Sequence, residues 1–103
     1  MPTRIALIHA IRVSIDPITE VFRQEWPQAE PINILDDSLS TDVESARGLT
    51  PAITGRIVSL ARYGSDIGAA AILFTCSAFG LVLIIAFKFA FLRFNSFIKY
   101  SKV

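Results

Sequence analysis

Three short apolar runs limit this chain to a small set of folds. They are "RIALIHA" (residues 4–10), "PINILDD" (residues 31–37) and "AAILFTC" (residues 70–76). Their length and their content of β-branched residues are typical of strands that are buried on both faces. Stretches with helical periodicity separate the runs, and this alternation predicts βαβ units with a parallel sheet and right-handed crossovers. We therefore expect an α/β fold with a three-stranded parallel βαβαβ sheet.

Two of the separating stretches begin with helix start signals. "SIDPITEVFRQEW" offers Asp16 as N-cap and Pro17 at the first helical position, and "TPAITGRIVSLARYGSD" offers Thr50 and Pro51 in the same roles. Between them, "DVESARGL" predicts a short helical turn that ends at Gly48.

Each predicted strand ends at or near a residue that can take part in chemistry, namely His9, Asp36 or Cys76. Ligands of open parallel sheets bind beyond the carboxyl ends of the strands, so these side chains are expected at one edge. A cysteine there can act as a thiolate base, and the backbone N–H groups of Ser77 and Ala78 can bind an oxyanion. The alternative is structural for all three, because a buried cysteine packs as a small apolar side chain and His or Asp can simply bind a loop.

Composition excludes several classes of site. One cysteine among 103 residues rules out an intrachain disulfide and, with a single histidine, leaves too few soft ligands for zinc. A formal net charge of +1 gives no reason to expect a nucleic-acid partner. No Gly-rich loop follows the first apolar run, and we expect neither a cofactor nor a metal. No secretory signal is present either, so we expect a cytoplasmic protein.

Five segments, taken in order, are similar to the N-terminal part of the aspartate/glutamate racemase superfamily. They are "IALIHA", "SIDPI", "LDDSLS", "GLTPAITGRIVSLARY" and "AAILFTCSAFG", and they span about residues 4–80. The most specific is the strand that ends in Thr75 and Cys76, followed by the small residues Ser77 and Ala78. The superfamily includes glutamate, aspartate and hydantoin racemases, maleate isomerase and arylmalonate decarboxylase. The resemblance implies a flavodoxin-like, racemase-type half-domain.

The implied activity is that of an isomerase: cofactor-independent proton transfer at a carbon next to a carboxylate. The implied ligand is a small carboxylate or an amino-acid-like substrate. Cys76 matches the cysteine of the first half in family racemases, and Ser77 and Ala78 match positions that bind the substrate carboxylate. The residues that the resemblance places in the site are Cys76 as the catalytic thiolate, and Thr75, Ser77, Ala78, His9 and Ser14 around the substrate.

The chain also departs from the family. Family racemases use two cysteines, one from each of two pseudo-symmetric halves, and this sequence contains one. Inversion by two bases needs the opposing cysteine, so we expect a truncated member with little or no racemase activity of its own.

The composition changes abruptly near Gly80. All nine acidic residues precede residue 67, whereas residues 81–103 contain four basic residues, no acidic residue and five of the eight phenylalanines. We expect residues 1–80 to form the racemase-like half-domain and residues 81–103 to be an unrelated apolar, basic tail that prefers helix. A frameshift, an inserted element or a misread gene end produces such a tail. Its apolar surface predicts self-association or membrane contact.

The alternative interpretation concerns residues 67–87, a stretch of 21 residues without a charge that is long enough to cross a bilayer as a helix. The chain would then be a small membrane-anchored or interaction protein, with Cys76 as a packing residue. The basic residues that follow would place residues 1–66 outside the cytoplasm.

Overall fold

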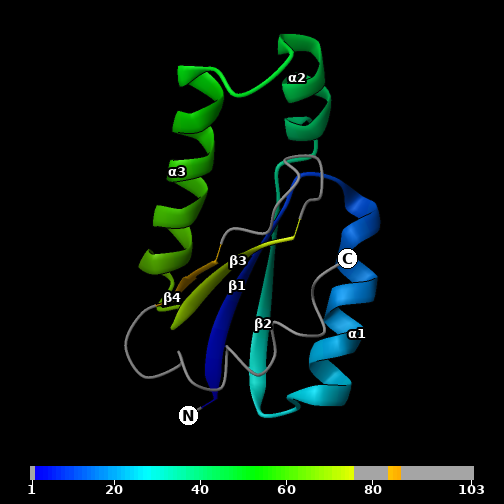
Figure 1. The fold of residues 1–103 in the computed structure, drawn as a ribbon. Coiled ribbons are helices and arrows are strands. Elements are labelled where there is room, and N and C mark those ends of the chain that lie inside the picture. The colour runs from blue at the N-terminus through cyan, green and yellow to red at the C-terminus, as the bar shows by residue number, and fades with distance from the viewer. Residues whose placement is uncertain (1, 76–83, 87–103) are drawn as a thin grey trace.

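The computed structural model describes residues 2–75 and 84–86 (Figure 1). Its elements, in chain order, are β1 (Thr3–His9), the 3-10 turn η1 (Arg12–Ser14), α1 (Ile15–Glu25), β2 (Ala29–Leu35), α2 (Leu39–Ala46), α3 (Pro51–Asp66), β3 (Ala71–Phe74) and β4 (Ile84–Ala86). The strand order is β2-β1-β3-β4; β1 pairs in parallel with β2 and β3, and β4 pairs antiparallel with β3. The predicted α/β fold with three parallel strands is confirmed.

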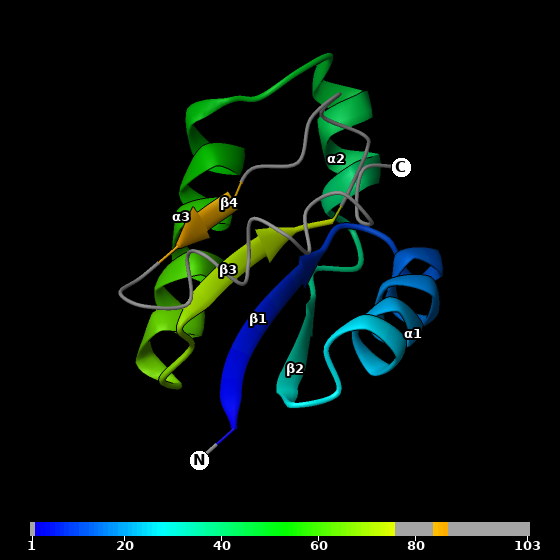
Figure 2. The ribbon, with the colours of Figure 1, turned by 60° about the horizontal axis from the view of Figure 1, so that its bottom comes forward.

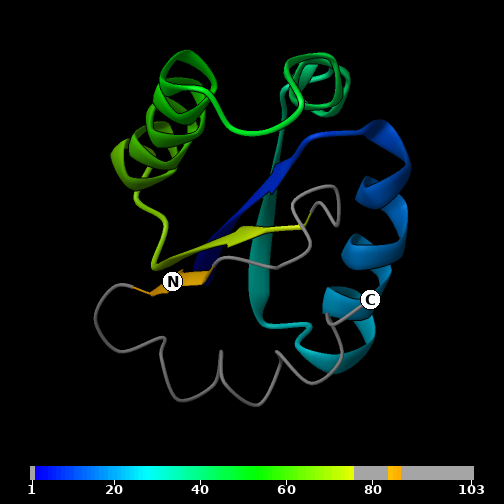
Figure 3. The ribbon, with the colours of Figure 1, turned by 45° about the horizontal axis from the view of Figure 1, so that its top comes forward.

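The helices cover both faces of the sheet (Figures 2 and 3). β2 and β3 lie on opposite sides of β1, so crossovers of the same hand place their helices on opposite faces. Along β1 the side chains alternate accordingly: Ile5 and Leu7 pack in the cluster with α1, whereas Ala6 and Ile8 pack in the cluster with α3.

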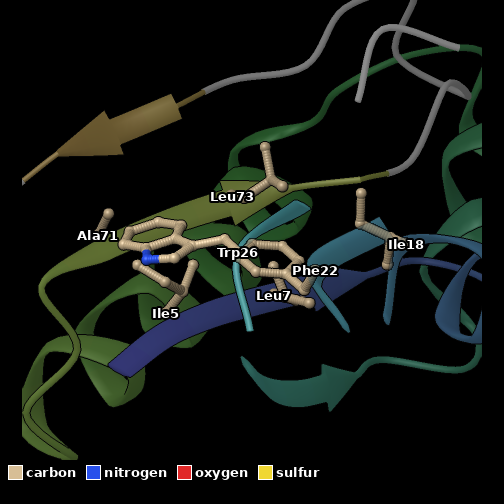
Figure 4. Packing of buried hydrophobic residues seen from close by; sticks show 7 residues of the cluster. All are labelled: Ile5, Leu7, Ile18, Phe22, Trp26, Ala71 and Leu73. Atoms are coloured by element: carbon tan, nitrogen blue, oxygen red, sulfur yellow. The ribbon is translucent and has the colours of Figure 1, made fainter. Parts of the chain in front are cut away.

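The core between α1 and the sheet is built around two aromatic side chains (Figure 4). Phe22 and Trp26, one helical turn apart, stack with ring centroids 6.2 Å apart and lie against apolar side chains of the strands. Figure 4 shows the Trp26 indole between Ile5 and Ala71, and the Phe22 ring close to Leu7. This packing holds the C-terminal part of α1 against the sheet.

On the other face, Gly64 allows α3 to approach β1 closely. A Cβ atom at residue 64 would lie 2.9 Å from the Cβ of Ala6, closer than side chains tolerate. Ile57, Leu60 and Ala61 of the same helix complete this contact with the sheet. A small residue at this point is therefore a condition for the observed spacing of helix and sheet.

One of the two predicted helix starts is confirmed and the other is wrong. Thr50 is the N-cap of α3, where its side-chain oxygen accepts a hydrogen bond from the N–H of Ile53 at 3.1 Å, and Pro51 is the first helical residue. Asp16 is not the cap of α1, because the turn η1 leads directly into the helix and Ser14 takes the N-cap position. The Ser14 hydroxyl makes no capping bond and is engaged elsewhere.

The helix α2 begins earlier than predicted, at Leu39, because the buried side chains of Leu39 and Val43 lie one turn apart on the core side. Its end is close to the predicted one. Arg47 adopts a left-handed conformation with φ 59°, and the N–H of Gly48 donates to the carbonyl of Val43.

The expected C-terminal helix is wrong for the three tail residues that the structure describes. Ile84–Ala86 form the strand β4, which extends the sheet beside β3. The rest of the 81–103 tail lies outside the described residues. A single membrane-spanning helix over residues 67–87 is also wrong, since Ala71–Phe74 and Ile84–Ala86 are strands. Among the helices of the described residues, none combines the length and apolar character that a membrane crossing requires.

Candidate functional site

The predicted site residue His9 ends β1 at the carboxyl edge of the sheet, the edge at which β1, β2 and β3 end. Side chains alternate between the two faces of β1, so His9 lies on the same face as Ile5 and Leu7, which is the face covered by α1. His9 is fully buried, with 0% of its surface exposed to solvent. Among the described residues it is the only polar or charged one that is buried. A buried imidazole needs hydrogen-bond partners for both ring nitrogens.

Two hydroxyl groups meet at one of these nitrogens. Nδ1 of His9 lies 2.6 Å from Oγ1 of Thr75 and 2.7 Å from Oγ of Ser14, and the two hydroxyl oxygens are 3.3 Å apart. Thr75 arrives there because β3 pairs in register with β1, with Phe74 opposite Ile8, so the next residue lies beside His9. The predicted residues His9, Ser14 and Thr75 are thus in mutual contact.

The other ring nitrogen has a partner that the sequence did not single out. Nε2 of His9 lies 2.8 Å from Oδ1 of Asn33, on the edge strand β2. Asn33 in turn donates through Nδ2 to the hydroxyl of Thr19 on α1, at 3.3 Å. We call His9, Ser14, Asn33 and Thr75 the His9 cluster. It ties β1, β2, β3 and the start of α1 together at the carboxyl edge.

Burial lowers the pKa of His9 below its ordinary value of 6.5, and the hydrogen bond with Asn33 opposes this by raising it. The neutral ring is favoured because removing an imidazolium from water is costly. With both nitrogens engaged by protein groups, His9 does not face a ligand as a free base. Its contacts hold the hydroxyl groups of Ser14 and Thr75 next to each other.

Asp36 follows β2 at the same edge, but its side chain belongs to a different cluster. Its carboxylate accepts hydrogen bonds from Nε and Nη2 of Arg56 on α3, at 3.1 and 2.9 Å. Arg56 also reaches Asp42 on α2 at 2.7 Å, and this hydrogen bond lowers the pKa of Asp42. Asp36 therefore joins β2 to the helices, and the predicted meeting of His9 and Asp36 is limited to the backbone, where the N–H of Asp36 donates to the His9 carbonyl at 3.0 Å.

Cys76, Ser77 and Ala78 lie outside the described residues. In sequence, Cys76 follows Thr75 directly. Asn33 is the site residue that sequence reasoning missed; its only signal was a single polar side chain within the apolar run "PINIL". No group of three metal-ligating side chains occurs within residues 2–75 and 84–86.

Within the described residues, the His9 cluster therefore offers two hydroxyl groups held beside a buried imidazole. Such groups can bind and orient a small polar ligand beside whatever residue follows Thr75. Comparisons with models of protein families, with curated proteins and with solved structures gave no match. The resemblance to the racemase superfamily thus remains a prediction.

Proposed function

We propose that this chain is one half of an aspartate/glutamate racemase-type site, which binds a small carboxylate at the carboxyl edge and removes the proton on its α carbon with the Cys76 thiolate. Ser77 and Ala78 hold the carboxylate in this proposal, and Thr75 borders the reacting carbon. His9 and Ser14 act by supporting Thr75.

The observation that carries the proposal is the convergence of Thr75 and Ser14 on Nδ1 of His9, at 2.6 and 2.7 Å. These three residues come from β1, η1 and the end of β3, and the resemblance had assigned all three to one site. A purely structural histidine needs one partner per ring nitrogen, and here two hydroxyl groups share Nδ1. The cluster also adjoins the start of α1, whose dipole favours a negatively charged ligand.

One thiolate limits the reaction to one face of the substrate. The thiolate takes the α proton and becomes a thiol, and the electron pair of the broken C–H bond delocalises into the carboxylate, which becomes an enediolate. The same thiol then returns a proton to the same face, so the configuration is retained. The net result in water is proton exchange without racemisation, because the sequence holds no second cysteine.

Deuterium exchange tests this directly. The chain is incubated in D₂O with both enantiomers of aspartate and glutamate, and the α-proton signal is followed by NMR. We expect this signal to fall with at least one compound while no opposite enantiomer accumulates. Cys76→Ala should slow the exchange by about a hundredfold or more, the usual contribution of a proton-transferring side chain.

The matched control is Ser59→Ala, on an exposed position of α3, which covers the face of the sheet opposite to α1. It should exchange the α proton as fast as the unaltered chain does. No exchange with any compound, or equal exchange in Cys76→Ala, would overturn the proposal. Racemisation that disappears in Cys76→Ala would overturn its one-base form.

The alternative, a membrane-anchored or interaction protein with a purely structural Cys76, has less support. The membrane span considered for it, residues 67–87 as one helix, conflicts with the pairing of Ala71–Phe74 with β1 in the sheet.

A further inference from the structure

The orientation of the Asn33 amide follows from the hydrogen bonds of Thr19. The Thr19 hydroxyl donates its one hydrogen to the carbonyl of Ile15, at 2.7 Å. Toward Asn33 it can therefore only accept, so the amide nitrogen of Asn33 faces Thr19 and its oxygen faces His9. The reversed amide would set an oxygen against a hydroxyl whose hydrogen is already used.

This orientation decides which nitrogen of His9 carries the hydrogen. An amide oxygen 2.8 Å from Nε2 requires a donor there, so the neutral ring bears its hydrogen on Nε2 and leaves Nδ1 as an acceptor.

The acceptor Nδ1 then takes the hydroxyl hydrogen of Thr75. The Ser14 hydroxyl has two acceptors within reach, Nδ1 at 2.7 Å and the carbonyl oxygen of Ile11 at 3.0 Å, and its hydrogen points into the protein toward both. Among the described residues, the Thr75 hydroxyl also reaches the carbonyl of Ile8, at 3.4 Å, and this oxygen already accepts the backbone N–H of Thr75 at 3.0 Å. At 2.6 Å, Nδ1 of His9 is the better acceptor.

We propose that Asn33 is a positioning residue that holds His9 in the Nε2–H form and thereby turns the hydroxyl hydrogens of Thr75 and Ser14 into the protein. At the carboxyl edge both side chains then present oxygen lone pairs. They meet a hydrogen-bond donor of the ligand, such as an ammonium or N–H group, and the ligand's carboxylate oxygens are left to other groups. This use of the arrangement rests on the proposed function; the hydrogen placement itself does not.

The inference is tested by the ¹⁵N signals of the one histidine in the chain. Long-range ¹H–¹⁵N correlation on the histidine-labelled protein at pH 7.5 distinguishes the two neutral forms. We expect a protonated Nε2 and an unprotonated Nδ1 in the unaltered protein. Asn33→Leu removes the acceptor and should move a large share of the population to the Nδ1–H form, since Nδ1–H can donate to the oxygens of Thr75 and Ser14.

Asn33→Asp keeps an acceptor and adds a negative charge next to Nε2. It should retain the Nε2–H form and raise the midpoint of the His9 titration. At a given pH the ratio of protonated to neutral His9 should then be about tenfold higher, or more, than in the unaltered protein. The matched control is Glu30→Gln on the same strand, whose side chain pairs with Arg4 at the opposite edge; it should leave both His9 signals unchanged.

A hydrogen on Nδ1 in the unaltered protein would overturn the inference, whatever the variants do. Asn33→Leu with the unaltered tautomer would overturn it as well, with a dispersed amide spectrum showing that this variant is folded. No ligand enters these measurements. A chain that fails to exchange α protons but keeps the Nε2–H form would thus refute the proposed function alone.

Discussion

Nδ1 of His9 and Oγ1 of Thr75 lie 2.6 Å apart and join the ends of β1 and β3 across 66 positions of sequence. Ser14 approaches the same nitrogen at 2.7 Å, so the imidazole has two hydroxyl neighbours where one hydrogen bond would satisfy it. This sharing makes the stability contributions of the two hydroxyl groups dependent on each other.

Thr75→Val and Ser14→Ala should therefore be non-additive. Each alone should lower the free energy of unfolding by about 1 kcal/mol, because the remaining hydroxyl can still serve Nδ1. The double variant leaves the buried nitrogen without a partner, and we expect it to cost about 1 kcal/mol more than the sum. Urea unfolding of the four proteins measures this, and simple additivity would contradict the shared arrangement.

The pH dependence of stability follows from the lowered pKa of His9. In the unfolded chain the ring titrates near 6.5. Just below that pH the unfolded state therefore binds a proton at His9, whereas the folded state, with its lower pKa, does not. The contribution of His9 to the free energy of unfolding should not change with pH above 6.5. It should fall as the pH drops from 6.5 toward the lowered pKa.

His9 is the only histidine in the sequence, so His9→Gln should remove this slope. Urea midpoints measured in small pH steps between 7.5 and 5.5 give the comparison, and NMR titration of the ring gives the folded pKa independently. A midpoint above 6.5 in the folded protein would contradict the account.

Two glycines of α3 should respond oppositely to the same substitution. Gly64→Ala places a methyl group 2.9 Å from the Cβ of Ala6, so we expect a destabilisation of about 1–3 kcal/mol despite the better helix propensity of alanine. Gly55→Ala meets nothing within 4 Å and should stabilise the protein by about 1 kcal/mol. Equal effects at the two positions would show that α3 does not approach β1 as described.

The pairing of Asp36 with Arg56 predicts that Asp36 does not influence the ring of His9. Asp36→Asn should weaken the attachment of α3 and lower the thermal midpoint, with a smaller loss at high salt because the pair is partly exposed. The His9 ring signals should stay as they are. A shift of those signals as large as that in Asn33→Asp would instead place Asp36 within the His9 cluster.

The sequence was informative wherever the signal was local. The parallel strands follow from apolar runs, and the start of α3 follows from Thr50 and Pro51, whose effect is confined to one turn. The start of α1 was mispredicted since the Asp16-Pro17 signal competes with η1, a turn whose Ser14 is used for the contact with His9.

Side-chain partners were less predictable, because they depend on elements distant in sequence. Asp36 follows the end of a strand as predicted, yet its carboxylate pairs with Arg56, which lies twenty positions later on α3. Asn33 shows no distinguishing pattern in the sequence, and its importance appears only when β2 is placed beside β1. The positions of strand ends could be predicted, whereas the choice among the polar groups gathered there could not.

The central claim, that the carboxyl edge of the sheet binds a small polar carboxylate, is tested most directly by ligand titration of the ¹⁵N-labelled protein. The compounds are those of the exchange experiment. The account predicts saturable shifts of the Ser14 and Thr75 amides and of the His9 ring nitrogens, with the Arg4 and Glu30 amides at the opposite edge unchanged. Saturable shifts confined to Arg4 and Glu30, or no shift at Ser14, Thr75 and His9 with any compound, would contradict it.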